Sequence, residues 1–287
     1  MKELCIISGK GGTGKTSITS SFVALAEDKV IVDCDVDAPD LHLILKPEIE
    51  EEHEFRGSSL AVIDADKCTE CGACEEICEF DAITDIRVNP ILCEGCNVCT
   101  ITCPEDAITL EEQLSGYVFI SETRFGPMSH AQLNIAEEAS GKLITQVRNN
   151  ARKIAEDRGF DLIIIDGPPG IGCPVISSLS GVDIALIITE PTLSGLHDLS
   201  RILQLVKGFG TTALVCINKY DINTSNADEI VTFCEDMGIS VVGRLPYDQI
   251  VTEAMVAGKA VVEFSDSELA DEMTRMWGTV KNLLRRN

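Results

Sequence analysis

The sequence is poor in basic residues and contains no long hydrophobic run. Its 287 residues include 23 Lys and Arg against 47 Asp and Glu, so the formal net charge is −24. This charge argues against a nucleic-acid partner, because binding to a phosphate backbone requires a cationic surface. The longest apolar stretches, such as residues 162–165 and 184–188, are far shorter than the roughly 20 residues that span a bilayer. We therefore expect neither nucleic-acid binding nor stable membrane insertion.

The first residues also lack the features of an export signal. They carry one lysine and an acid, Glu3, and no small-residue cleavage site follows. We therefore expect a cytoplasmic protein. Disulfide frameworks are typical of small secreted chains, so they are not expected here. The 13 cysteines then indicate metal binding rather than a disulfide framework.

Acidic residues and cysteines are concentrated in one segment. Residues 50–112 hold 17 Asp and Glu against three basic residues, a net charge of −14, together with eight of the 13 cysteines. So sharp a change of composition indicates a separate structural unit. We predict an insert at residues 56–115, within a larger domain formed by residues 1–55 and 116–287.

Outside this segment, short apolar runs alternate with stretches suited to helices. Strands are predicted near residues 4–8, 30–33, 161–166, 182–189, 211–218 and 239–242. Helices are predicted at residues 16–27, after Ser194, at 227–237 and at 269–286. This alternation predicts a doubly wound α/β fold with a mostly parallel sheet, whose ligands bind at the carboxyl ends of the strands.

A glycine-rich loop lies between the first predicted strand and the first predicted helix. It matches the P-loop pattern G-x-x-x-x-G-K-[ST], and its residues are Gly9, Lys10, Gly11, Gly12, Thr13, Gly14, Lys15 and Thr16. In this motif backbone N–H groups surround phosphate oxygens, the lysine neutralises the β- and γ-phosphates, and the hydroxyl ligates Mg²⁺. A flexible glycine turn is the alternative, but the strand–loop–helix context favours a site for ATP or ADP with Mg²⁺. We include Ser17, which follows the loop, among the nucleotide-binding residues.

A single acid, Asp166, ends the predicted strand at residues 161–166. An acid in this place supports the Mg²⁺ shell in Walker-B motifs. The Gly- and Pro-rich loop at residues 167–172 follows, and its backbone could face the γ-phosphate. The alternative is that Asp166 merely caps a turn.

Three motifs in order resemble the MinD/ParA/Mrp class of deviant-Walker P-loop ATPases: Lys10 within the P-loop, the acidic segment at residues 33–41, and residues 166–172. The resemblance covers the chain outside the insert. It implies an ATP-hydrolysing dimer, either a homodimer or a heterodimer with a paralogue, in which Lys10 reaches the partner subunit's nucleotide. It also implies that Asp35 orients the attacking water or supports Mg²⁺. Taken without the family, Lys10 could equally be a solvated loop lysine.

The resemblance further implies adenine contacts from Asn218 and from the loop that begins at Pro246. Ordinary turn residues at strand ends are the alternative for both. Asp37 and Asp40 stay open, since an acidic loop is often only solvated. Cys173, just after the loop at residues 167–172, is the one cysteine outside the acidic segment that we consider as a functional thiol.

The eight cysteines of the acidic segment form two copies of the run C-x-x-C-x-x-C-x-x-x-C. In bacterial ferredoxins three close cysteines of a run bind one cluster and the fourth ligates the other cluster. The expected ligands are therefore Cys68, Cys71, Cys74 and Cys103 for one [4Fe–4S] cluster and Cys93, Cys96, Cys99 and Cys78 for the other. Zinc is the competing metal, but zinc sites use paired rather than triple cysteines. We expect the insert to be a small α+β ferredoxin-like domain.

The whole chain resembles MinD-superfamily ATPases that contain an inserted ferredoxin domain. The main hypothesis is that ATP binding and hydrolysis gate electron transfer through the two clusters to an unidentified protein partner, and the acidic insert favours a partner with a basic surface. One alternative is ATP-dependent assembly or delivery of iron–sulfur or other metal cofactors to an acceptor protein. Another is spatial organisation of the MinD/ParA type. For the apolar stripe of Met273, Trp277, Val280 and Leu284, packing on the sheet is favoured over membrane binding.

Overall fold

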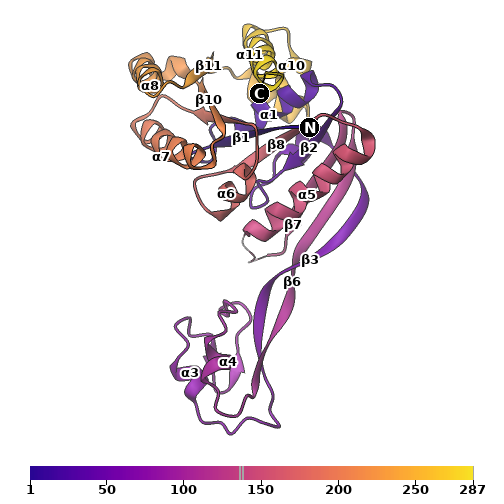
Figure 1. Ribbon diagram of the computed structural model, residues 1–287, viewed down its shortest axis with the longest axis vertical. Helices are drawn as coiled ribbons and strands as arrows, with labels where there is room; N and C mark the ends of the chain where they lie inside the picture. The colour runs from indigo at the N-terminus through magenta and orange to yellow at the C-terminus, as the bar shows by residue number, and fades with distance from the viewer. Residues whose placement is uncertain (136, 138, 287) are drawn as a thin grey trace. The chain divides into compact units, whose positions relative to one another are not determined.

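The computed structural model describes residues 1–135, 137 and 139–286 (Figure 1), and the chain forms two compact units. Unit 1 comprises Met1–Glu52, Val118–Gln132 and Ala139–Asn287. Unit 2 comprises His53–Tyr117 and Leu133–Glu138. Unit 2 therefore includes a second short segment that an insert at residues 56–115 does not contain.

A large sheet, mostly parallel, forms the frame of unit 1. Its strand order is β11-β10-β9-β1-β8-β2-β7-β6-β3. The strands are β1 (Lys2–Ser8), β2 (Lys29–Asp33), β3 (Glu48–Ile63), β6 (Ile108–Thr123), β7 (Gly126–Leu133), β8 (Leu162–Pro169), β9 (Ile184–Thr189), β10 (Thr212–Asn218) and β11 (Ser240–Leu245). The pairs that join β1 to β8 and β9, β2 to β7 and β8, and β10 to β9 and β11 are all parallel. Strands β3 and β6 have residues in both units.

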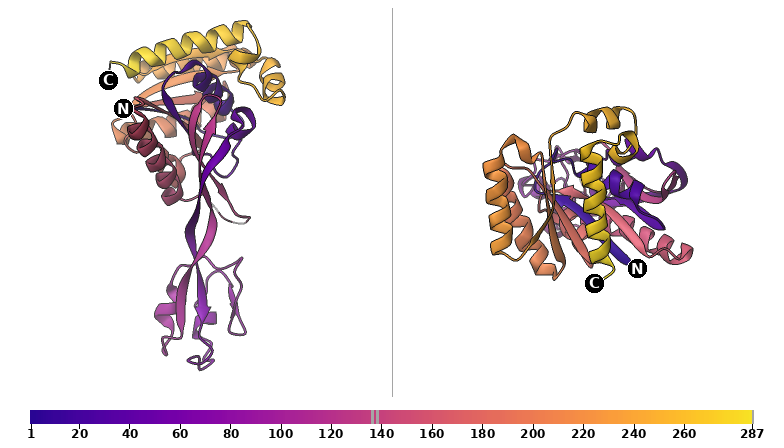
Figure 2. Two further views of the ribbon diagram at one scale, coloured as in Figure 1. Left: turned by 90° about the vertical axis from the view of Figure 1, so that its right-hand side faces the viewer. Right: turned by 90° about the horizontal axis from the view of Figure 1, so that it is seen from above.

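Helices cover both faces of this sheet (Figure 2). One layer contains α1 (Lys15–Leu25), α2 (Leu41–Leu45), α10 (Val261–Phe264) and α11 (Glu268–Leu284), and the other contains α5 (Gly141–Arg158), α6 (Cys173–Leu179) and α7 (Leu193–Phe209). The remaining helices of unit 1 are α8 (Thr224–Asp236), α9 (Ile250–Val256) and the 3₁₀ turn Tyr220–Ile222. The doubly wound fold predicted from the alternation of strands and helices is confirmed.

The middle residues of the central strands are apolar, as expected where both faces of a sheet are covered. Ile6, Ile31 and Ile164 of β1, β2 and β8 are fully buried. The C-terminal helix α11 completes the core with its apolar stripe, and its Trp277 ring lies 5.1 Å from the ring of Phe22. Packing of this stripe inside the protein, predicted from the sequence, is confirmed.

Two parts of unit 1 do not follow from the sequence prediction. No strand of the large sheet was predicted between residues 50 and 115. Strands β3 and β6, which begin and end this segment, nevertheless belong to that sheet. Helix α5, which is 18 residues long, was also not predicted. In the described part of the chain, no helix is long and apolar enough to cross a membrane.

Unit 2 has little regular structure and a core that contains cysteine. Two short helices, α3 (Ala73–Glu76) and α4 (Val98–Thr102), contact each other, and β4 (Ile83–Thr84) pairs with β5 (Arg87–Val88) in an antiparallel ladder. A small apolar cluster is formed by Ala61, Cys74, Ile83, Cys99 and Ile108, with Cys78, Cys93 and Cys103 packed against it. So few buried apolar side chains make a marginal core, and bound metals commonly stabilise units of this size.

Replacing Ser267 with alanine is expected to lower the free energy of unfolding of unit 1 by about 1 kcal/mol. The Ser267 side chain accepts a hydrogen bond from the backbone N–H of Ala270 and so caps the start of α11. Chemical denaturation followed by circular dichroism measures this loss. Ser225→Ala is the control, because Ser225 is exposed in the first turn of α8 and Asn223 is the residue that caps that helix; an equal loss in both variants would contradict the assignment.

Candidate functional site

The glycine-rich loop connects β1 to α1 at the carboxyl edge of the sheet. Gly12 and Gly14 adopt positive φ angles of 77° and 87°, a conformation that other residues rarely adopt. At Gly14 a side chain would also collide with its surroundings, since an added Cβ would lie 2.4 Å from Asn218 Nδ2. The Asn218 amide donates to the carbonyl of Thr13 at 2.8 Å and so holds the loop. The loop is therefore already curved as a phosphate-binding loop must be.

Lys15, the first residue of α1, lies between two carboxylates. Its Nζ is 3.1 Å from Asp35 Oδ2 and 3.4 Å from Asp166 Oδ1, and only 6% of its side chain is exposed. Burial alone would lower the pKa of Lys15, but the Asp166 and Asp35 carboxylates outweigh burial and raise it above its ordinary value. A protonated ammonium is thus held at the mouth of the loop.

Asp166 is brought against the start of α1, as a Walker-B acid must be. It is 1% exposed, and its two oxygens accept hydrogen bonds of 2.9 Å from the hydroxyls of Thr16 and Thr19. The Thr16 hydroxyl and the Asp166 carboxylate therefore place two oxygen atoms close together, and oxygen atoms are the ligands that Mg²⁺ prefers.

Asp33 is a site residue to which sequence reasoning gave no role. It is 2% exposed, and its Oδ1 accepts from the backbone N–H of Asp35 at 3.0 Å. Among the described residues its Oδ2 has no hydrogen-bond partner. Burial, with the Asp166 carboxylate nearby, raises the pKa of Asp33 well above its ordinary value. The role of Asp33 follows from the strand order. Strands β2 and β8 are parallel neighbours, and Asp33 pairs in register with Asp166.

A cavity of about 350 Å³ opens in front of these side chains. Its lining includes the predicted nucleotide-binding residues Gly11, Gly12, Thr13, Gly14, Lys15, Thr16, Ser17, Asn218 and Pro246. Tyr247 and Asp248, from the predicted loop that begins at Pro246, line it too. Four lining residues were not predicted, namely Lys219, Val251, Thr252 and Met255. Its volume falls in the range of sites for small ligands.

The remaining candidates of this region are more scattered. Gly9 and Lys10 lie beside β9 and α7 instead of lining the cavity, and the Lys10 ammonium is 3.0 Å from Glu190 Oε2. Asp40 lines the cavity, whereas Asp37 accepts from the backbone N–H of Ala139 at 3.1 Å. Cys173 is exposed at the first turn of α6.

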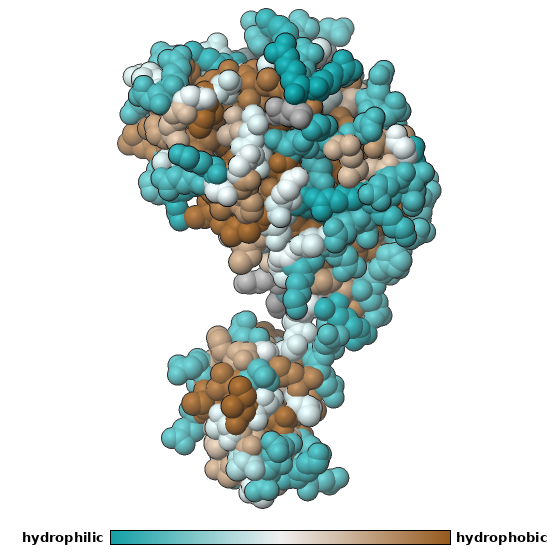
Figure 3. Space-filling view, in the orientation of Figure 1, coloured by the Kyte–Doolittle hydropathy of each residue, from teal (hydrophilic) through white to brown (hydrophobic). Residues whose placement is uncertain are grey.

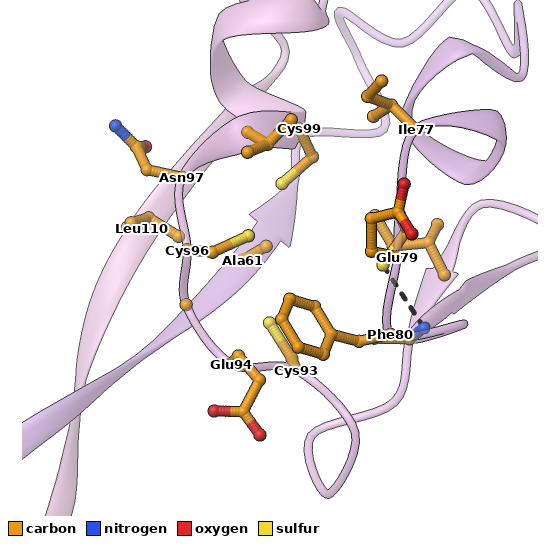
Figure 4. Close-up of a pocket in the computed structure, with 15 residues that line it drawn as sticks. Ala61, Ile77, Glu79, Phe80, Cys93, Glu94, Cys96, Asn97, Cys99 and Leu110 are labelled. Carbon is orange, nitrogen blue, oxygen red and sulfur yellow. Dashed lines mark hydrogen bonds between the residues drawn. The ribbon is translucent and has the colours of Figure 1, made fainter.

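A second cavity, of about 380 Å³, lies in unit 2 (Figure 4). Four cysteines line it: Cys78, Cys93, Cys96 and Cys99. These are the four that the ferredoxin pattern assigns to one cluster, with Cys78 contributed by the other run. The rest of the lining is mostly apolar and includes Ile77, Phe80, Val98 and Leu110.

The two cysteine runs also share one backbone conformation. Left-handed residues occur at Glu70, Gly72 and Asp81 and recur 25 positions later at Gly95, Asn97 and Asp106, which is also the spacing between the two runs. The sulfur of the fourth cysteine of each run accepts a hydrogen bond from the backbone N–H of the residue four positions later. The Ala82 N–H donates to Cys78 Sγ at 3.4 Å, and the Ala107 N–H donates to Cys103 Sγ at 3.3 Å. Hydrogen bonds of this kind stabilise cluster thiolates.

Among the residues that the structure describes, no group of three or more His, Cys, Asp or Glu side chains could hold a metal ion. The structure therefore does not show a metal site at the two cysteine runs, which lie in the described part of the chain.

Comparison with known proteins agrees with the geometry of unit 1. Residues 4–261 match the family described as CobQ/CobB/MinD/ParA nucleotide binding domain. An uncharacterised protein of Methanocaldococcus jannaschii is 36% identical over 98% of this chain and 97% of its own length. The septum site-determining protein MinD of Buchnera aphidicola is 23% identical over 90% of this chain and 83% of its own.

Solved structures show the same fold. The septum site-determining protein MinD of Pyrococcus horikoshii, solved in complex with Mg-ADP, has a TM-score of 0.61 at 18% identity and covers 98% of this chain and 96% of its own. The family match extends over most of the chain, and the loop, lysine and acids that define its nucleotide site are assembled here. The chain therefore belongs to the CobQ/CobB/MinD/ParA family of P-loop ATPases.

Proposed function

We propose that the chain binds Mg-ATP in the cavity in front of α1 and hydrolyses it to ADP and phosphate. The observation that carries this proposal is the convergence of Lys15, Thr16, Asp35 and Asp166 at the carboxyl edge of the sheet. The similar protein of Pyrococcus horikoshii was solved with Mg-ADP, which supports the same ligand here.

Each side chain has a role that its present contacts suggest. With ATP bound, Lys15 would exchange its carboxylate partners for the β- and γ-phosphates, while Thr16 and Asp166 would hold Mg²⁺, which would neutralise charge on the phosphates. Asp35 is only partly buried and would orient the attacking water. Asp33, whose second oxygen has no partner among the described residues, would offer a further hydrogen-bond acceptor beside that site. Asn218 and the loop after Pro246 border the space that is left for the adenine base.

We further propose that unit 2 holds two [4Fe–4S] clusters, bound by Cys68, Cys71, Cys74 and Cys103 and by Cys93, Cys96, Cys99 and Cys78. The cavity lined by four of these thiols and the 25-residue repeat of the backbone support the assignment. Bound clusters would supply one-electron chemistry. The acidic residues of unit 2 would disfavour the added electron and lower the reduction potential.

The surface of unit 2 suits a protein partner. Of the 18 large hydrophobic side chains that are exposed among the described residues, six lie within residues 77–101. Ile77, Phe80 and Val98 line the cavity proposed for a cluster, whereas Ile91, Leu92 and Ile101 do not line it. Apolar areas are visible on the surface of unit 2 (Figure 3). Exposed apolar side chains within an acidic unit favour a partner whose surface is apolar at the centre and basic at the rim.

The comparisons give more weight to a second function, a nucleotide-switched ATPase of the MinD/ParA type. Several of the similar proteins are septum site-determining proteins, and one similar structure is a complex of MinC with MinD from Aquifex aeolicus. Two complete sets of four cysteines favour retained clusters over clusters that are handed on, so cofactor assembly is the weaker alternative. In both favoured functions ATP drives association of two subunits, and they differ in whether electrons move.

One experiment separates these functions. The reconstituted protein is reduced with dithionite, excess reductant is removed, and cluster reoxidation and iron content are followed with ATP, with ADP and without nucleotide. Faster electron release with ATP at constant iron content supports gated electron transfer. Iron that moves to an apo-acceptor supports assembly. ATP hydrolysis with no effect on either quantity leaves the MinD/ParA-type switch alone.

A further inference from the structure

Glu190 binds two lysines that belong to different parts of the nucleotide site. It follows the last residue of β9, next to the strand that leads into the P-loop. Its Oε2 is 3.0 Å from the Lys10 ammonium and its Oε1 is 2.6 Å from the Lys219 ammonium. The Glu190 side chain is only 14% exposed. Burial alone would raise the pKa of Glu190, but the hydrogen bonds from Lys219 and Lys10 outweigh it and keep the carboxyl ionised.

The backbone on both sides of this carboxylate is fixed. Gly9 packs so closely against α7 that an added Cβ would lie 2.3 Å from Asp198 Cβ, and the Ser8 hydroxyl donates to the Lys10 carbonyl at 2.8 Å. Lys219 donates to the Gly12 carbonyl at 3.3 Å. Only the Lys10 side chain, 37% exposed, is free to move without disturbing the loop.

The Lys10 ammonium cannot bind Glu190 of its own subunit and a nucleotide of a facing subunit at the same time. The ammonium of lysine is a compact charge on a flexible stem, so it can exchange one anion for another. An association that uses Lys10 across the interface must therefore first break the Lys10–Glu190 ion pair. By linkage, the free energy of this pair opposes the association.

We propose that Glu190 is a positioning residue that retains Lys10 within its own subunit and so sets the protein concentration at which ATP-bound dimers form. This inference rests on the proposed function, because it assumes nucleotide-dependent dimers in which Lys10 crosses the interface. In this proposal Glu190 competes with the nucleotide for Lys10. Lys219 acts separately, because its ammonium donates to the Gly12 carbonyl and so holds the P-loop.

Glu190→Gln tests the proposal, because the amide keeps the size of the side chain and removes its charge. With a non-hydrolysable ATP analogue, sedimentation velocity is expected to show a dimer dissociation constant about fourfold to 25-fold lower, because dimerisation breaks one such pair in each of the two subunits and each partly exposed pair is worth about twofold to fivefold. In ATPase assays the protein concentration for half-maximal rate is expected to fall by the same factor, with the maximal rate unchanged.

Two further variants make the result specific. Glu263→Gln removes a similar ion pair, 2.8 Å from Arg124, that involves no residue of the loop, and it is expected to leave the dissociation constant unchanged. Lys219→Ala leaves Lys10 as the one cation paired with Glu190, so at saturating analogue the dissociation constant is expected to rise instead of falling. An unchanged dissociation constant in Glu190→Gln, or an equal fall in Lys219→Ala, would overturn the proposal. A wild-type protein that binds the analogue and stays monomeric would instead refute the proposed dimer.

Discussion

Replacing Lys15 with glutamine is expected to slow ATP hydrolysis by at least about 10²- to 10³-fold, the loss seen when one preorganised charge donor is removed from a transition state. Lys15 is the buried cation nearest to Asp166 and Asp35, at 3.4 Å and 3.1 Å. Glutamine fills much of the same space but cannot neutralise the charge that develops on the transferred phosphoryl group. Phosphate release under saturating ATP measures the rate.

Lys29→Met is the matched control for this experiment. Lys29 is also a buried lysine of unit 1, 5% exposed, and its ammonium donates to the carbonyl of Ala26 at 2.9 Å. It makes no contact with the nucleotide cavity, so its loss tests whether removal of any buried lysine is enough. We expect Lys29→Met to keep the hydrolysis rate within about twofold if it remains folded, which melting curves establish. Full activity in Lys15→Gln would refute the nucleotide site.

The second large effect concerns iron. Reconstituted protein is expected to hold about eight iron atoms per chain, four for each cluster. Serine at Cys78, Cys93, Cys96 and Cys99 together should reduce this to about four, because these thiols line one cavity. Serine at Cys68, Cys71, Cys74 and Cys103 should leave the other four. Iron analysis and electron paramagnetic resonance of the reduced protein measure both outcomes.

The single variant Cys78→Ser tests the crossed ligation. Cys78 lies in the first run but lines the cavity of the second, with Cys93 and Cys99. Its loss should therefore destabilise the cluster of the second run and spare that of the first. Cys173→Ser, an exposed cysteine outside both runs, is the control and should keep all the iron. Loss of the first-run cluster in Cys78→Ser would contradict the crossed arrangement, and zinc in place of iron would refute both clusters.

The fold of unit 1 could be predicted where local sequence and tertiary environment agree. Strands such as β1 and β8 each contain a run of four apolar residues, and the glycines of the P-loop occur where the chain must turn sharply. Strand β3 shows the opposite case. Its first half, residues 48–54, is dominated by glutamate and resembles a solvated loop. It forms a strand because β6 lies beside it. The two strands are far apart in the sequence: Ser58 of β3 and Ser115 of β6, which are hydrogen-bonded, are 57 positions apart.

The candidate site was predictable to the same degree. Lys15, Thr16 and Asp166 belong to motifs with fixed spacing, and the structure brings them together. Asp33 and Glu190 belong to no such spacing. Their positions depend on which strands are neighbours: Asp33 faces Asp166 because β2 lies beside β8, and Glu190 meets Lys10 because β9 lies beside β1. Sequence periodicity gives the strands but not their order.

The neighbouring positions of β3 and β6 have a consequence for the history of this chain. The polypeptide leaves the large sheet along one strand and returns along the next, and Arg158 pairs with Glu50 of the first and Glu122 of the second. A gene segment gained or lost between these strands would only lengthen or shorten the connection of a hairpin, without reordering the sheet. Insertions are tolerated best at such hairpin tips. A chain without the cysteine-rich segment would therefore keep the same order of strands in the large sheet.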